Sequence, residues 1–269
     1  MLRPHDLWQA WTWDPPIVAG LLLSAILYGR GDAPGRGISG WERAAYWFGW
    51  AGLAIALVSP IHAAGEVLFS AHMVQHEILM LVAGPFLVLG RPLVPYLWGL
   101  PGPWRRRVGG WGKSGWPNAC WRWLTRPFNA WCLHAIALWI WHAPSLFQAT
   151  LSSDLVHALQ HSSFLVTALL FWWALFRGHA AERNYGAAFF YVFTTAVHSS
   201  ILGALLTFAP SAWYPAYTTT VVEWGLSPLE DQQIGGLVMW VPSGFLFLFI
   251  GLGLFAKWMH STRSSVKIM

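Results

Sequence analysis

Charged side chains are scarce in this 269-residue chain, where aspartate, glutamate, lysine and arginine together make up 10% of the residues. Hydrophobic residues make up 56%. A soluble domain typically carries about 25% charged residues, so this composition excludes an ordinary water-soluble fold. The sequence therefore predicts an integral membrane protein in contact with a lipid bilayer.

Cysteine is also scarce. Only Cys120 and Cys132 are present, and they form no Cys-x-x-Cys pair, which excludes a disulfide framework and a dithiol redox motif. The formal net charge is +5 and the sequence pI is about 9.5. Membrane topology and attraction to anionic lipid account for this excess of positive charge, so we expect no nucleic-acid partner.

Seven apolar runs have the length of a membrane-crossing helix, which needs roughly 17 to 25 residues for about 30 Å of hydrocarbon. The predicted fold class is all-α, a polytopic membrane protein with seven transmembrane helices. No boundary divides these runs, so residues 1–269 are expected to form a single domain. The spans are expected near residues 14–30, 41–60, 71–90, 128–147, 154–177, 186–208 and 233–257.

Lysine and arginine fall almost entirely on one side of these spans. Fifteen of the 16 lie in or beside the first, third and fifth loops or the C-terminal tail, and only Arg3 lies on the other side. Because short cytoplasmic loops accumulate positive charge, the N-terminus is predicted to be outside and the C-terminus cytoplasmic. Residues 99–127, rich in Gly, Pro, Trp and Arg, are expected to be a coil on the inner membrane surface.

The histidines concentrate on the predicted outer side. Only His134, His179 and His260 of the 11 map to the inner side. The others are His5 in the N-terminal tail, His62 in an outer loop, His72, His76, His142, His157 and His161 at outer helix ends, and His198 about 15 Å below one.

Two of these helices carry the same spacing, "HMVQH" at residues 72–76 and "HALQH" at residues 157–161. Residues i and i+4 share a helix face, so each stretch projects two imidazoles in one direction at similar membrane depth. Polar groups in hydrocarbon are costly and commonly mark a site or a pathway. The two pairs therefore predict a ligand-binding or proton-transfer site.

Neighbouring side chains extend the candidate site. Met80 lies one turn below His76, and Met239 lies about eight residues below the outer end of the seventh span. Imidazole nitrogen and thioether sulfur suit a copper ion, whereas Mg²⁺ and Ca²⁺ prefer oxygen ligands. Glu77 faces about 100° away from His76, and it either binds metal, orients an imidazole or caps a charge.

Several stretches of the chain resemble one membrane-protein family. They are "FSAHMVQHEILMLVAGPFLVLGRP", "WIWHAPSLF", "HALQHSSFLV", "LGALLTFAPSAWYPAY" and "DQQIGGLVMWVPSG". They are similar to the integral-membrane CtaG family of cytochrome c oxidase assembly factors, and the resemblance covers about residues 40–258. The positions that match by motif are His72, His76, Trp141, His142, His157, His161, His198, Asp231, Gln232 and Met239. Many members have an apolar residue in place of Glu77 and a proline in place of Gly84, so the family does not support a role for Glu77.

The resemblance implies a seven-helix protein of the bacterial plasma membrane that is needed to make active haem–copper oxidase, with no catalytic activity of its own. Combined with the histidine pattern, it leads to the hypothesis that His72, His76, His157 and His161 hold copper in the outer half of the bundle, with His198 and Met239 as further ligands. The ion would pass to an oxidase subunit or a periplasmic copper chaperone.

Three other functions fit parts of the same pattern. A haem b held by two imidazoles would make the protein an electron carrier or a quinol enzyme. A copper transporter would need polar groups below His198, where the inner half of the bundle has few. A structural scaffold for oxidase subunits would bind no metal.

Overall fold

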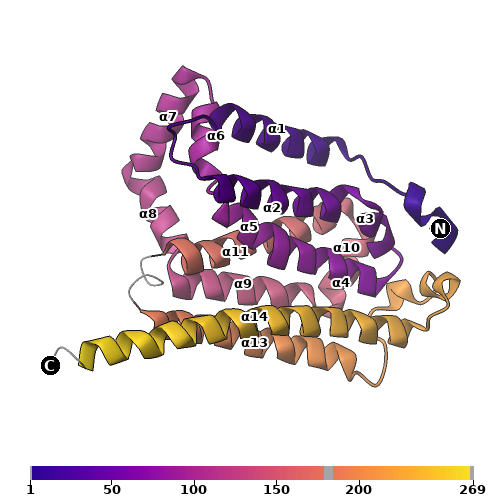
Figure 1. Ribbon diagram of the computed structural model, residues 1–269. Coiled ribbons are helices and arrows are strands. Elements are labelled where there is room, and N and C mark those ends of the chain that lie inside the picture. The colour runs from indigo at the N-terminus through magenta and orange to yellow at the C-terminus, as the bar shows by residue number, and fades with distance from the viewer. Residues whose placement is uncertain (1, 179–183, 267–269) are drawn as a thin grey trace.

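The computed structural model describes residues 2–178 and 184–266, and every regular element in these residues is a helix. The longer helices run side by side in one bundle, with the two chain ends at opposite ends of it (Figure 1). The all-α fold is confirmed. The sequence positions His179, Arg183 and Lys267 lie outside the described residues, as does the side chain of Arg263.

Seven helical segments match the predicted spans to within a few residues at most boundaries. They are α1 (Pro15–Gly31), α2 (Gly40–Val58), the continuous run of α4 (Phe69–Glu77), η2 (Ile78–Ala83) and α5 (Gly84–Leu89), α9 (Pro127–Trp141), α11 (Asp154–Arg177), α13 (Tyr185–Thr207) and α14 (Pro228–Val266).

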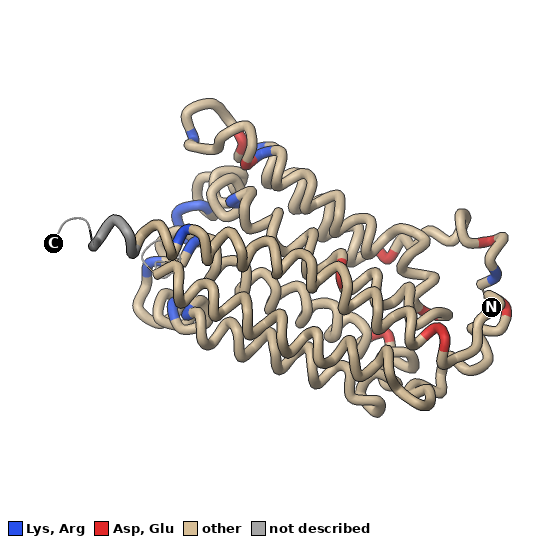
Figure 2. Tube along the Cα trace, turned by 60° about the horizontal axis from the view of Figure 1, so that its bottom comes forward, with Lys and Arg blue, Asp and Glu red and all other residues tan. Residues whose placement is uncertain are grey.

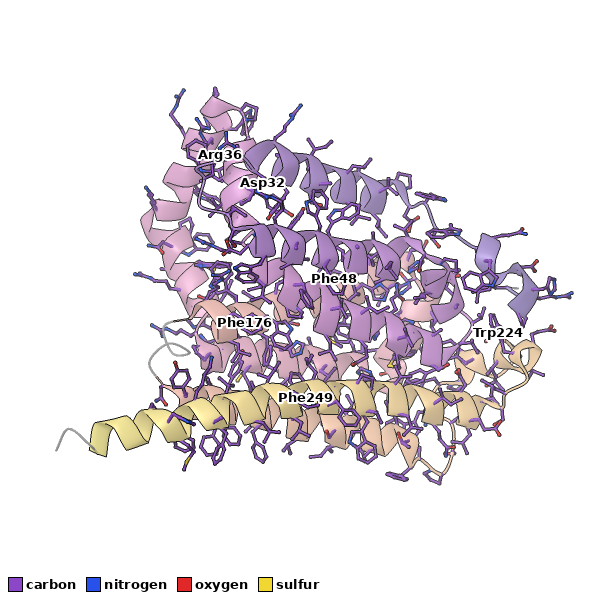
Figure 3. The ribbon with its side chains drawn as sticks, in the orientation of Figure 1. Asp32, Arg36, Phe48, Phe176, Trp224 and Phe249 are labelled. Atoms are coloured by element: carbon purple, nitrogen blue, oxygen red, sulfur yellow. The ribbon has the colours of Figure 1, made fainter. Side chains whose placement is uncertain are left out.

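Four of these segments are long and apolar enough to cross a membrane, namely Phe69–Leu89, Asp154–Arg177, Tyr185–Thr207 and Pro228–Ser261. Exposed apolar side chains such as Phe48 and Phe249, which are 56% and 68% exposed, cover the outside of the bundle (Figure 3). In water such a surface would aggregate, so it fits a lipid environment. Membrane insertion is therefore supported, while seven crossings and their orientation stay predictions.

The predicted span 128–147 is wrong at its end, because the helix breaks at His142. Helix α9 stops at Trp141, and Pro144 begins the separate helix α10 (Pro144–Ser152). Proline disfavours the helical conformation in the residue before it, and Ala143 is accordingly extended, with φ −62° and ψ 128°. His142 consequently lies at a helix end rather than inside a span.

The coil predicted for residues 99–127 is also wrong. Most of this stretch forms α7 (Gly102–Lys113) and α8 (Gly115–Leu124), which follow α6 (Leu93–Gly99). Neither α7 nor α8 contains a buried residue, and both expose tryptophans such as Trp104 and Trp116. A helix satisfies most of its backbone hydrogen bonds internally, which lowers the cost of contact with a membrane.

Charge separates along the bundle axis (Figure 2). Lysine and arginine gather at the end that holds α7 and α8, here called the basic end, whereas most carboxylates lie toward the opposite end. At the basic end the buried Glu42 carboxylate lies 3.4 Å from Arg91 Nη1 and 3.7 Å from Arg177 Nη2. These contacts join α2, the α5–α6 connection and α11.

Helices α13 and α14 pack against each other along much of their length. A Cβ atom on Gly236 would lie 2.5 Å from Thr207 Oγ1 and 2.7 Å from the Thr207 backbone nitrogen, so only glycine permits this close approach. Helix α14 also packs on α4, which is the helix that carries His72 and His76.

A buried histidine cluster as a candidate metal site

Helix α4 is anchored at its first turn by Asp231 of α14. The Asp231 carboxylate accepts hydrogen bonds from the backbone nitrogens of Phe69 (2.6 Å) and Ser70 (3.1 Å) and from the Ser70 hydroxyl. A carboxylate at a helix N-terminus satisfies free N–H groups and complements the helix dipole. Asp231, one of the positions that match the family by motif, holds the helix that carries His72 and His76.

The histidine pairs of α4 and α11 face each other across the bundle. Ring centroids are 4.3 Å apart for His72 and His76 and 4.2 Å apart for His157 and His161. Between the helices, His161 lies 5.5 Å from His72 and 5.2 Å from His76, and His157 lies 5.4 Å from His72. The structure thus brings together the four imidazoles that the spacing singled out.

A fifth imidazole, which the sequence reasoning did not include in the site, comes from the short helix α3 (Pro60–Gly65). The His62 ring stacks on His157 at 5.3 Å and meets His161 edge-on at 6.1 Å. Burial lowers the pKa of His62 below its usual value of 6.5, against the opposing effect of Glu66 and Asp14. The ring therefore stays neutral at pH 7.

Among the described residues, two groups of three side chains could each hold a metal ion. The outer triad is His62, His157 and His161, and the inner triad is His72, His76 and His161. Within each triad the ligand nitrogens all lie within 4.8 Å of one another. His161 belongs to both.

The glutamine of each His-x-x-Gln-His stretch contacts a histidine on a different element. Gln75 Nε2 lies 2.8 Å from His62 Nδ1 and also donates to the Ala56 carbonyl at 2.7 Å. Gln160 Oε1 lies 3.1 Å from His72 Nε2. The Gln75 amide nitrogen donates to His62, whereas the Gln160 amide oxygen can accept from His72. Both contacts fix the orientation of an imidazole ring, and they tie the triads together across α3, α4 and α11.

The connection between α13 and α14 closes over the cluster through two buried tyrosines. Tyr214 donates to the His142 carbonyl at 3.0 Å, and Tyr217 donates to the Gly65 carbonyl at 2.9 Å. The Gly65 carbonyl also lies 3.3 Å from His72 Nδ1. Burial raises the pKa of the Tyr217 phenol, so it keeps its proton and remains a donor. Both tyrosines belong to the stretch "LGALLTFAPSAWYPAY", so the family resemblance was the sequence signal that could have pointed to them.

Several ring nitrogens of the cluster are buried without a hydrogen-bond partner. Both nitrogens of His76 and Nε2 of His142 are in this state, and the two side chains are 1% and 3% exposed. The His142 ring lies 6.5 Å from His76, and its Nδ1 lies 2.6 Å from the Leu138 carbonyl. An unpartnered buried polar group costs about 1–3 kcal/mol, and a bound cation would remove that cost.

A cavity of about 610 Å³ reaches the outer triad from the end of the bundle opposite the basic end. All three imidazoles of that triad line it, whereas His72 and His76 do not. Its walls also include three exposed carboxylates, those of Asp14, Glu66 and Asp154.

The remaining candidates lie outside both triads. The His198 ring packs edge-on against Trp131 of α9 at 5.5 Å, and neither of its nitrogens has a hydrogen-bond partner. Met80 and Met239 pack in the main hydrophobic core, where the Met80 carbonyl accepts a hydrogen bond from Trp172 Nε1 at 2.8 Å. Among the described residues, no group of potential metal ligands includes His198 or Glu77.

Helix α4 passes into the π-helical segment η2 directly after Glu77. One buried carboxylate oxygen of Glu77 has no hydrogen-bond partner. Short π-helical segments are rare and frequently occur at functional sites. Here the segment begins within one turn of His76, which supports a functional role for this end of α4.

Comparison with known proteins gives the family that the sequence stretches resemble. The family described as cytochrome c oxidase caa3 assembly factor matches residues 21–261. An uncharacterised protein of Mycobacterium bovis and one of Mycobacterium tuberculosis are each 27% identical over 273 residues, which covers 94% of this chain and 40% of the relative. An uncharacterised protein of Mycobacterium leprae is 24% identical and covers 92% of this chain and 39% of the relative.

The chain therefore spans about two fifths of the length of these mycobacterial relatives. No solved structure matches it significantly.

Proposed function

Since this chain belongs to the cytochrome c oxidase caa3 assembly factor family, we propose that it binds copper through its histidine cluster and passes the ion to a haem–copper oxidase during assembly. The observation that carries this proposal is the convergence of His62, His72, His76, His157 and His161 from three separate helices. The receiving partner is an oxidase subunit or a periplasmic copper chaperone, and the protein acts without catalysing a reaction.

The donor set fits copper. Imidazole nitrogen binds Cu, Zn, Ni and Fe, whereas Mg²⁺ and Ca²⁺ require oxygen ligands that the inner triad lacks. Three neutral imidazoles leave the full charge of the ion in a low-dielectric interior, where the cost of a charge rises steeply. A monovalent ion is therefore favoured over a divalent one, and Cu(I) meets this condition.

The close packing of the rings argues against the haem alternative. Bis-histidine ligation needs a flat slot for the macrocycle between two axial imidazoles. Here His161 contacts both His72 and His76 at about 5.5 Å or less, and Phe164 fills the space beside His76 at 4.6 Å. No such slot separates α4 from α11.

The proposed location is the bacterial plasma membrane, with the histidine cluster on the outer side. The separation of basic residues to the opposite end of the bundle supports this orientation through the preference of lysine and arginine for cytoplasmic loops (Figure 2). Copper released from the cluster would then reach an oxidase subunit from the outer face.

The test is copper binding by the detergent-purified chain. We expect bound Cu(I) and no haem absorption band, and His161→Ala should lower copper affinity by well over ~10-fold because it removes a ligand of both triads. The control is His134→Ala, since His134 lies apart from the cluster and hydrogen-bonds Thr167 at 3.2 Å. Stoichiometric haem without copper, or full copper binding by a well-folded His161→Ala variant, would refute the proposal.

A cellular measurement separates copper delivery from scaffolding. Deleting the gene should lower haem–copper oxidase activity and the copper content per oxidase molecule, while the oxidase polypeptide is still made. Loss of the polypeptide with normal copper content in what remains would favour the scaffold.

A further inference from the structure

The two triads differ in burial although they share His161. His72 and His76 of the inner triad are 0% and 1% exposed, and neither reaches the cavity. In the outer triad His157 is partly exposed, and all three imidazoles line the cavity wall. An ion arriving through the cavity meets the outer triad first, and it contacts the inner triad only through His161.

The two triads also differ in the charged side chains that lie near them. Asp14, Glu66 and Asp154 lie exposed on the cavity wall, beside the outer triad. The inner triad contains only imidazoles, and His76 there has two buried nitrogens without a partner. Carboxylates lining a cleft raise the local concentration of cations, whereas unpartnered nitrogens in a buried site favour retention.

We propose that the cluster is a two-position copper path, in which the ion is captured at the outer triad and moves to the inner triad by exchanging ligands about His161. This inference rests on the proposed copper-binding function. In the exchange, the bonds from the ion to His62 and His157 break as bonds to His72 and His76 form, while His161 stays bound. Each exchange replaces one imidazole nitrogen on the ion by another, so the ion stays Cu(I) and no electron or proton is transferred.

The sharing of His161 limits how many copper ions the chain can bind at once. One imidazole lone pair binds one ion, so the two positions cannot both be fully ligated at once. The wild-type chain should therefore bind one Cu(I) tightly, although it contains two triads.

The experiment measures Cu(I) transfer to the purified chain from the colorimetric chelator bicinchoninate, without oxygen, at equilibrium and by stopped flow. For His62→Ala we expect an affinity within ~3-fold of wild type, because the inner triad is intact, but loading slowed by more than ~10-fold. For His76→Ala we expect affinity lowered by more than ~10-fold and rapid return of the ion to the chelator.

Other outcomes overturn the inference. If His62→Ala loads at the wild-type rate, capture does not use the outer triad. If it loses tight binding as fully as His161→Ala does, the five histidines form one site. Two tightly bound ions per wild-type chain would show two independent sites. Absence of copper binding by wild type would instead refute the proposed function itself.

A second set of variants avoids the buried residues. Replacing Asp14, Glu66 and Asp154 by their amides changes only exposed side chains, so the effect on folding should be small. We expect slower loading at low salt, by ~3-fold or more, with unchanged affinity, and the difference should shrink at high salt because salt screens exposed charges. The matched control is Asp6→Asn, an exposed carboxylate that does not line the cavity. Equal loading by the triple variant and this control would overturn the path through the cavity.

Discussion

Gln160 of α11 reaches across the bundle to His72 of α4, with 3.1 Å between Gln160 Oε1 and His72 Nε2. His72 Nδ1 in turn lies 3.3 Å from the Gly65 carbonyl. A neutral imidazole has only one N–H and donates to only one of these oxygens. The Gly65 carbonyl already accepts from Tyr217, so the N–H is directed at Gln160, the nearer oxygen. Gln160 then fixes the orientation of the ring, and the Nδ1 lone pair is left for a metal ion.

The first prediction concerns this contact. Gln160→Ala should lower Cu(I) affinity by ~10-fold, because removal of a group that orients a ligand imidazole typically costs 10–100-fold in metal affinity. Chelator competition measures the change. Gln9→Ala is the matched control, since Gln9 is exposed in the N-terminal helix η1 (Pro4–Gln9). Wild-type affinity in a well-folded Gln160→Ala variant would contradict this role.

The second prediction separates a structural carboxylate from a metal ligand. Asp231→Asn should lower the free energy of unfolding by ~1–2 kcal/mol, because α4 loses a charged acceptor at its N-terminus. Copper affinity should change by less than ~3-fold. Thermal unfolding in detergent, followed by tryptophan fluorescence, gives the first quantity. If copper affinity collapsed while stability was unchanged, Asp231 would be a ligand after all.

The third prediction concerns the basic end. Glu42→Gln should destabilise the fold by ~1–3 kcal/mol, because Arg91 and Arg177 lose a buried charged partner. Copper binding should be unaffected, since the histidine cluster lies toward the other end of the bundle. Glu223→Gln is the control, because both side chains of the Glu223–Arg3 pair are at least half exposed. Such exposed pairs contribute ~0–1 kcal/mol to the free energy of unfolding. Equal stability of the two variants would contradict a structural role for Glu42.

The fourth prediction is the topology. Reporter fusions near residues 66, 150 and 220 should report the outer side, and a fusion near residue 112 in α7 should report the cytoplasm, because arginine and lysine crowd that end. A cytoplasmic signal from the α13–α14 connection would place the histidine cluster on the wrong side for delivery to the outer face.

Helical periodicity was enough to predict much of this protein. The length of the apolar runs predicted the helical segments. Periodicity placed His72 with His76 and His157 with His161 on shared helix faces, because that relation depends only on residues four apart. The break at His142 could also have been found in the sequence, since Pro144 follows two residues later.

The relation between helices was decided only by the tertiary structure. His62 joins the outer triad because α3 packs closely on α4, where a Cβ on Gly65 would lie 3.2 Å from His72 Cα. His198, predicted as a further ligand, lies against Trp131 and outside both triads. Asp231 caps a helix 162 residues earlier in the chain. A sequence specifies the depth and face of a side chain within its own helix, but the rotation of each helix in the bundle depends on packing between distant segments.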